Sequence, residues 1–198
     1  MRSRGRFRAA IGLGVLVGLA GCGHMPVTSM IKLARIELDK TDPAQLAAAV
    51  KLPRALRPRR QGVALRLTVK LNSGVQETHD FTLRETSDPA DLVSLRDEVD
   101  AASQIYAYRL DAAEAARVSA VRESLKRKQA ASGSRGGSIT IAVRPEVCRT
   151  GEIAAGPVLF TTYLRTGETG GYVPLARDVD LRTLSPQHDV AATLAPCE

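Results

Sequence analysis

The clearest pattern along the chain is a strict alternation of apolar and polar residues over positions 63–72. The apolar positions are Val63, Leu65, Leu67, Val69 and Leu71. Because successive side chains of a strand point to opposite faces of a sheet, this pattern predicts a strand with one face in the core. The turn residues Asn72-Ser73-Gly74 follow, and residues 75–84 return with Phe81 and Leu83 on the inner face. The segment is therefore predicted to be a β-hairpin.

Other apolar or β-favouring segments predict further strands. Residues 30–38 are aliphatic on both faces, which is typical of an interior strand. The remaining predicted strands are 103–110, a strand from Ile139 toward Cys148, and a second hairpin of 158–165 with 172–178 around the Gly-rich segment 166–171. Residues 181–198 are expected to be mostly loop or a short turn.

Helix start signals precede two short segments. Thr41-Asp42-Pro43 combines a capping side chain with proline at the first helical position, which predicts a short helix over 44–51. The residues on its apolar side are Leu46, Ala49 and Val50. An acidic helical stretch over 87–101 begins in a similar way, at Ser87-Asp88-Pro89.

A longer helix is predicted over 112–130, because Asp111 and Glu114 form a capping pair at its start. Its inward-facing residues are Ala115, Val118, Val121 and Leu125. The Gly- and Ser-rich segment 132–137 that follows is interpreted as a plain linker. Together these elements predict an α+β fold, with an antiparallel or mixed sheet of five to seven strands and two or three helices packed on it.

The chain opens with the layout of an export signal. Four arginines, at positions 2, 4, 6 and 8, precede an apolar run over 9–20 that ends in Leu19-Ala20-Gly21-Cys22. A helix needs about 20 apolar residues to cross a bilayer, and this run is shorter. A cleaved signal is therefore favoured over an uncleaved membrane helix.

The cysteine directly after Leu-Ala-Gly resembles the lipobox of bacterial lipoproteins. The resemblance implies that residues 1–21 are a signal peptide, that Cys22 is lipidated, that 22–28 is a tether, and that 29–198 is a single globular domain. Gly23 is not the aspartate that retains many such proteins in the inner membrane. By that family rule we expect a periplasm-facing protein of the outer membrane. The alternative is an ordinary cysteine behind a plain secretory signal.

Charge changes once the signal is removed. The full chain has a formal net charge of +7, and without the four signal arginines it is +3 over 177 residues. With so small an excess of positive charge and few aromatic residues, no nucleic-acid partner is predicted.

Cys148 and Cys197 remain once Cys22 is assigned to lipid, and an even pair in an oxidising compartment predicts a disulfide. On the chain-entropy model, closing this loop stabilises the fold by roughly 4 kcal/mol. The alternative, a thiol nucleophile or a metal pair, lacks any CxxC or Cys/His spacing.

Catalytic patterns are weak. His24 falls in the tether, His79 shares a strand face with Phe81 and Leu83, and His188 stands beside Asp189 in a predicted loop. These placements predict no triad, and no cofactor is expected. Asp178 and Asp180 would share a strand face, but two carboxylates alone make a weak cation site.

Four arginines, Arg54, Arg57, Arg59 and Arg60, form a predicted basic loop that could contact an anionic leaflet or lipopolysaccharide. A solvated loop is the alternative. The Gly-rich hairpin tip at 166–171 is a second candidate contact surface.

The leading hypothesis is a non-enzymatic accessory, assembly or binding subunit, held to the membrane by its lipid and working with an envelope protein partner. One alternative is an envelope hydrolase in which His79, His188 or Asp178 converge in a pocket. Another is a binder of an anionic glycolipid or glycan through the basic loop. The sequence favours a role without catalysis but leaves the enzyme question open.

Overall fold

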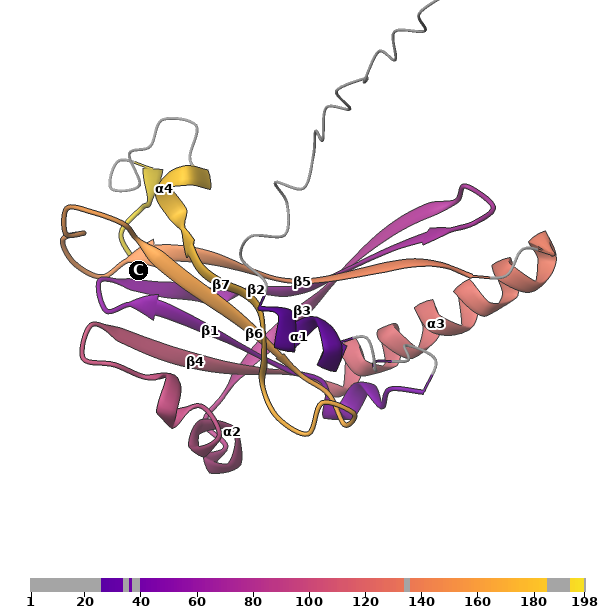
Figure 1. Cartoon of the computed structure of the whole chain (residues 1–198), viewed down its shortest axis with the longest axis horizontal. Coiled ribbons are helices and arrows are strands. Elements are labelled where there is room, and N and C mark those ends of the chain that lie inside the picture. The colour runs from indigo at the N-terminus through magenta and orange to yellow at the C-terminus, as the bar shows by residue number, and fades with distance from the viewer. Residues whose placement is uncertain (1–25, 34–35, 37–39, 134–135, 185–192, 198) are drawn as a thin grey trace, which may run out of the picture.

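The structure of the chain is a computed structural model that describes residues 26–33, 36, 40–133, 136–184 and 193–197. The predicted signal peptide, Cys22, His24 and His188 lie outside the described residues. The described part contains a sheet of seven strands in the order β5-β2-β3-β4-β1-β6-β7, and every neighbouring pair is antiparallel (Figure 1). This confirms the predicted α+β fold and the size of its sheet.

The strands are β1 (Ala47–Pro53), β2 (Leu56–Leu71), β3 (Gln76–Thr86), β4 (Ser103–Leu110), β5 (Gly137–Arg149), β6 (Leu159–Arg165) and β7 (Val173–Asp180). The helices are α1 (Val27–Leu33), α2 (Pro89–Val93), α3 (Ala112–Ser132) and α4 (Leu181–Leu184), with 3-10 turns at Pro43–Gln45 and Arg96–Glu98.

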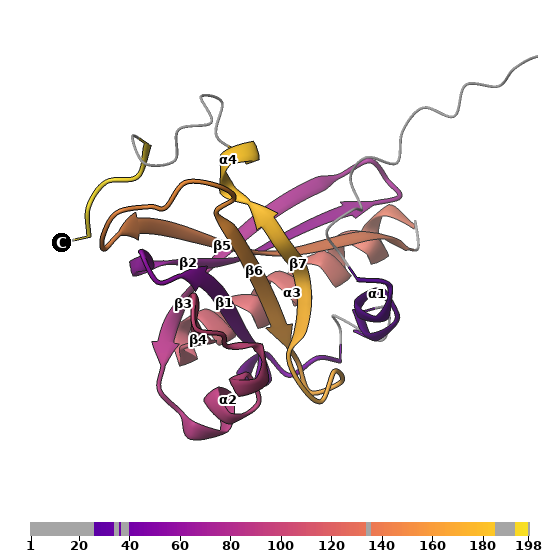
Figure 2. The same ribbon diagram turned by 60° about the vertical axis from the view of Figure 1, so that its left-hand side comes forward.

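The predicted hairpin is formed by β2 and β3, with Leu65 opposite Phe81. β3 pairs with β2 through residues 76–82 and with β4 through 83–86, so it links two halves of the sheet. Figure 2 shows β6 and β7 of one half crossing over β5 and β2 of the other. The alternating apolar side chains of β2 are buried in the main core, together with Phe81 and Leu83, as the sequence predicts.

The predicted helix over 44–51 is wrong. Only a 3-10 turn forms at Pro43–Gln45, where the Asp42 side chain accepts a hydrogen bond from the Ala44 amide, and the alanines continue as β1. β1 lies between β4 and β6, and residues 47–50 are at most 2% exposed. Alanine favours a helix in isolation, but this burial on both faces outweighs that preference.

The predicted strand over 30–38 is also wrong for its first part, because residues 30–33 belong to α1, which packs against β7. An apolar run without a clear period fits a buried helix as well as a buried strand. Residue 36 is described without helix or strand, and 34–35 and 37–39 lie outside the described residues.

The remaining elements follow the sequence closely. β4, β5 and the hairpin of β6 with β7 lie where strands are predicted, and the acidic stretch forms α2 followed by a 3-10 turn. α3 begins at the predicted cap, where an Asp111 oxygen accepts a hydrogen bond from the Glu114 amide at 2.8 Å. Val118 and Leu125 of α3 are buried in the core.

Cys148 and Cys197 form the predicted disulfide, with an S–S distance of 2.03 Å. The bond ties residues 193–197 to the end of β5, where the Arg149 amide donates to the Ala195 carbonyl and the Cys197 amide to the Arg149 carbonyl. Within the described ranges, no helix is both long and apolar enough to cross a membrane.

Candidate functional site

Three of the four predicted arginines lie in a strand, not in a loop. Arg57, Arg59 and Arg60 belong to the first residues of β2, while Arg54 lies in the turn before it. Arg54 points elsewhere, since its Nε donates to the Ala101 carbonyl at 2.8 Å. The basic composition and Pro58 suggest a loop, but pairing with the end of β5 holds this segment extended.

The three β2 arginines line a cleft of about 730 Å³, which we call the arginine cleft. Arg84 of β3 contributes a fourth guanidinium, and Tyr108 of β4 forms part of the wall. The wall also includes Glu85, Glu146 and the Cys148–Cys197 disulfide. The cleft is therefore assembled from β2, β3, β4, β5 and the C-terminal segment.

A β-bulge projects Arg59 and Arg60 away from the ladder. The pairing of β2 with β5 shifts between Pro58 and Val63, and Gln61 adopts a left-handed φ of 59°. Gly62 packs so closely that a Cβ there would lie 2.9 Å from the Arg59 Cβ. Bulges redirect side chains near functional sites, and here the bulge frees two adjacent arginines from strand alternation.

The charges in the arginine cleft are unequally balanced. Arg57 lies 3.6 Å from the Glu85 carboxylate and 5.8 Å from the centre of the Tyr106 ring, and the Arg84 Nε donates to Asp111 at 2.7 Å. Arg59 and Arg60 form no ion pair with any described residue. The four arginines therefore exceed the two glutamates of the lining, and the cleft carries a net positive charge.

Tyr108 supplies a polar group that stays neutral. Its residue is only 3% exposed, and its hydroxyl has no hydrogen-bond partner among the described residues. Burial, and then the nearby Glu85 carboxylate, raises the pKa of Tyr108 above its ordinary value. The phenol therefore remains protonated at neutral pH and can donate a hydrogen bond to an acceptor in the cleft.

The residues predicted for a hydrolase do not converge. The half-buried His79 ring lies 3.3 Å from Glu77, whose carboxylate also pairs with Lys128. Asp178 accepts from the Thr161 hydroxyl, and no described interaction joins it to His79. The Asp180 carboxylate accepts hydrogen bonds from the backbone amides of Val158 and Arg182. It therefore holds the start of α4, and no described interaction joins it to His79 or Asp178. His188 lies outside the described residues.

A buried ionic cluster was not predicted from the sequence. Asp91 of α2 is fully buried, with Arg109 and Arg165 each 2.7 Å from its carboxylate oxygens. Glu98 pairs with Arg177 at 3.1 Å and accepts from the Tyr163 hydroxyl at 2.8 Å. These contacts fasten residues 87–102 to the sheet. The acidic composition of the stretch was visible, but its basic partners come from distant strands.

No group of three or more His, Cys, Asp or Glu suited to a metal ion occurs in the part of the chain that the structure describes. Comparisons with protein-family models, curated proteins and solved structures found no match to this chain. The chemistry of the arginine cleft is thus the basis for assigning a function.

Proposed function

We propose that this protein is a lipid-anchored, non-enzymatic binding subunit of the bacterial envelope, and that the arginine cleft holds an anionic group of a glycolipid or glycan. One observation carries the proposal: four arginines line one cleft, and Arg59 and Arg60 form no ion pair with any described residue. A guanidinium binds a phosphate or carboxylate through two parallel hydrogen bonds, which a point charge cannot do.

The cleft has the size and groups of a binding site. Its volume of about 730 Å³ lies within the range of small-ligand sites. Tyr108 adds a neutral donor next to the cations, so an anion could accept from a phenol and from guanidinium groups at once. Guanidinium and phenol groups keep their protons at neutral pH, which suits holding a charge better than transferring a proton.

The anchor supports the same role. Lipidation at Cys22, implied by the lipobox, would hold the domain at the periplasmic face of the outer membrane. Several acyl chains make such attachment effectively permanent. A domain held there meets anionic lipid headgroups and glycans continuously, so even a modest affinity of the cleft would be used. We propose that the envelope protein partner also meets the domain at this membrane face.

The test is binding of the mature chain, residues 22–198 with Cys22→Ser so that no lipid is attached, to vesicles containing lipid A and to neutral phosphatidylcholine vesicles. We expect binding to the anionic vesicles only, weakening as salt rises. Replacing Arg59 and Arg60 together by Ala should weaken binding roughly 10- to 30-fold, because each cation contributes about 1 kcal/mol near an anionic surface.

The matched control replaces Arg96 and Arg127 by Ala. Both side chains are exposed and neither lines the arginine cleft, so the net charge falls equally. If the control pair weakens binding as much as the cleft pair, the attraction is a property of the whole surface and the proposal is wrong.

A further inference from the structure

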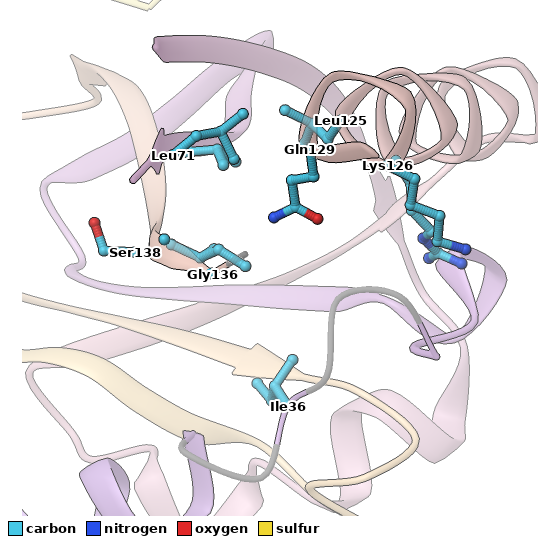
Figure 3. Close-up of a pocket in the computed structure, with 11 residues that line it drawn as sticks. Ile36, Leu71, Leu125, Lys126, Gln129, Gly136 and Ser138 are labelled. Atoms are coloured by element: carbon cyan, nitrogen blue, oxygen red, sulfur yellow. The ribbon is translucent and has the colours of Figure 1, made fainter. Parts of the chain in front are cut away.

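A second cavity lies at the other end of β2, between α3 and the start of β5. Its volume is about 370 Å³, and we call it the α3 cavity (Figure 3). Its apolar lining consists of Ile36, Val69, Leu71, Leu125 and Ile139. Val69 is ten residues along β2 from Arg59, which at about 3.3 Å per residue places the two sites roughly 30 Å apart. The α3 cavity is therefore independent of the arginine cleft.

Polar groups of α3 line one side of this apolar space. Figure 3 shows the Gln129 side chain reaching into the space between Leu71 and Lys126. The Gln129 amide has no hydrogen-bond partner among the described residues. The Lys126 ammonium lies 3.1 Å from Glu123, which is not part of the lining. The helix thus presents an amide and a cation above an apolar floor.

Arg122 adds a buried donor to the same side. Its guanidinium donates to the Thr41 carbonyl, while its Nε is buried and has no described partner. A buried N–H of a charged group without an acceptor is unfavourable, because the group loses its water without replacement. The Arg122 side chain also borders the α3 cavity, so a second cation lies beside Lys126 in its lining.

The β5 side of the α3 cavity carries an exposed apolar residue. Gly137, where a Cβ would lie 2.4 Å from the Lys70 carbonyl oxygen, lets β5 start directly against β2. Two residues on, Ile139 lines the cavity and is 49% exposed. An exposed aliphatic side chain beside an apolar cavity gains free energy when a hydrocarbon covers it.

We propose that the α3 cavity binds an anionic amphiphile, such as a fatty acid or a lysophospholipid. The acyl chain would lie on the apolar floor, and the anionic head would accept a hydrogen bond from the Gln129 side-chain amide, near the positive charges of Lys126 and Arg122. Apolar contact supplies the affinity for the chain, and the two cations select an anionic head over a neutral one.

The experiment titrates the mature chain, residues 22–198 with Cys22→Ser, with palmitate and with its uncharged monoacylglycerol, using calorimetry. We expect saturable binding of one palmitate per chain and at least tenfold weaker binding of the monoacylglycerol. Gln129→Glu places a carboxylate beside the proposed head and should weaken palmitate binding at least tenfold.

Arg127→Gln is the matched control, because it changes the charge of α3 by the same amount at an exposed position outside the lining. It should leave palmitate binding within twofold. The double change of Arg59 and Arg60 to Ala should also leave it unchanged, so this proposal can fail while the arginine cleft stands. Absent or unsaturable binding of palmitate, equal affinity for the monoacylglycerol, or equal effects of Gln129→Glu and Arg127→Gln would each overturn the proposal.

Discussion

At the scale of single residues, the position of Asp91 is unusual for a carboxylate. α2 buries this side chain and leaves its neighbours Leu92 and Val93 41% and 59% exposed, which reverses the usual orientation of polar and apolar residues. The reversal is stable because Arg109 and Arg165 compensate the buried charge, and Arg109 also reaches Asp88 at 3.0 Å. A polar contact, not apolar burial, therefore attaches α2 to the sheet.

The first prediction is that Asp91→Asn lowers the free energy of unfolding by about 3 kcal/mol. Removing one partner of a buried ion pair is strongly destabilising, because the remaining charges lose their compensation. Urea denaturation followed by circular dichroism measures the change. Asp97→Asn is the control, since the Asp97 side chain is 94% exposed and its change should stay within about 0.5 kcal/mol. Equal stability of both variants would contradict this account of Asp91.

At the scale of elements, the start of β5 depends on the absence of a side chain. Gly137 pairs with Leu71, and its backbone approaches the neighbouring Lys70 carbonyl more closely than any Cβ allows. We predict that Gly137→Ala destabilises the protein by about 1–3 kcal/mol, because β5 must move away from β2. Gly151→Ala is the matched control, since a Cβ at Gly151 meets nothing within 4 Å. Thermal unfolding of both variants tests this, and equal melting temperatures would contradict it.

Elements were predictable from the sequence where local and tertiary preferences agree. The alternation over 63–72, the turn that follows it and the Asp111 cap each define their element without reference to the rest of the chain. The helix prediction for residues 44–51 failed because alanine has a high helix propensity. Its small side chain also suits a strand closely packed between two others. Nothing local distinguishes these two outcomes.

At the scale of the whole molecule, the candidate site was predictable only in part. Arg57, Arg59 and Arg60 lie within four consecutive positions, so the basic charge of this segment could be recognised from the sequence. Arg84 and Tyr108 join them because β3 pairs with both β2 and β4. That pairing depends on long-range contacts, and no short motif encodes it. The disulfide was predictable because assigning Cys22 to lipid, as the lipobox resemblance implies, leaves one pair of cysteines.

The last prediction concerns acid stability, which depends on several carboxylates together. Burial opposes ionisation of Glu98, but hydrogen bonds from Arg177 and Tyr163 hold its pKa below the ordinary value of 4.5. A hydrogen bond from Lys51 lowers the pKa of Asp100 to about 2. Hydrogen bonds from backbone amides lower the pKa values of the Asp111 and Asp180 carboxylates, which accept them.

A carboxyl with a lower pKa in the folded state binds fewer protons there than in the unfolded chain, so acid favours unfolding. Its contribution is present above about pH 4.5 and is lost as the pH falls toward 2. We therefore expect the urea midpoint to be constant from pH 7 to 5 and to fall steeply below pH 4.5. Glu98→Gln should lower the midpoint at pH 7 and make the fall shallower, whereas Asp97→Asn should change neither. A midpoint that stays constant down to pH 3 would show that these carboxylates do not stabilise the fold through their charge.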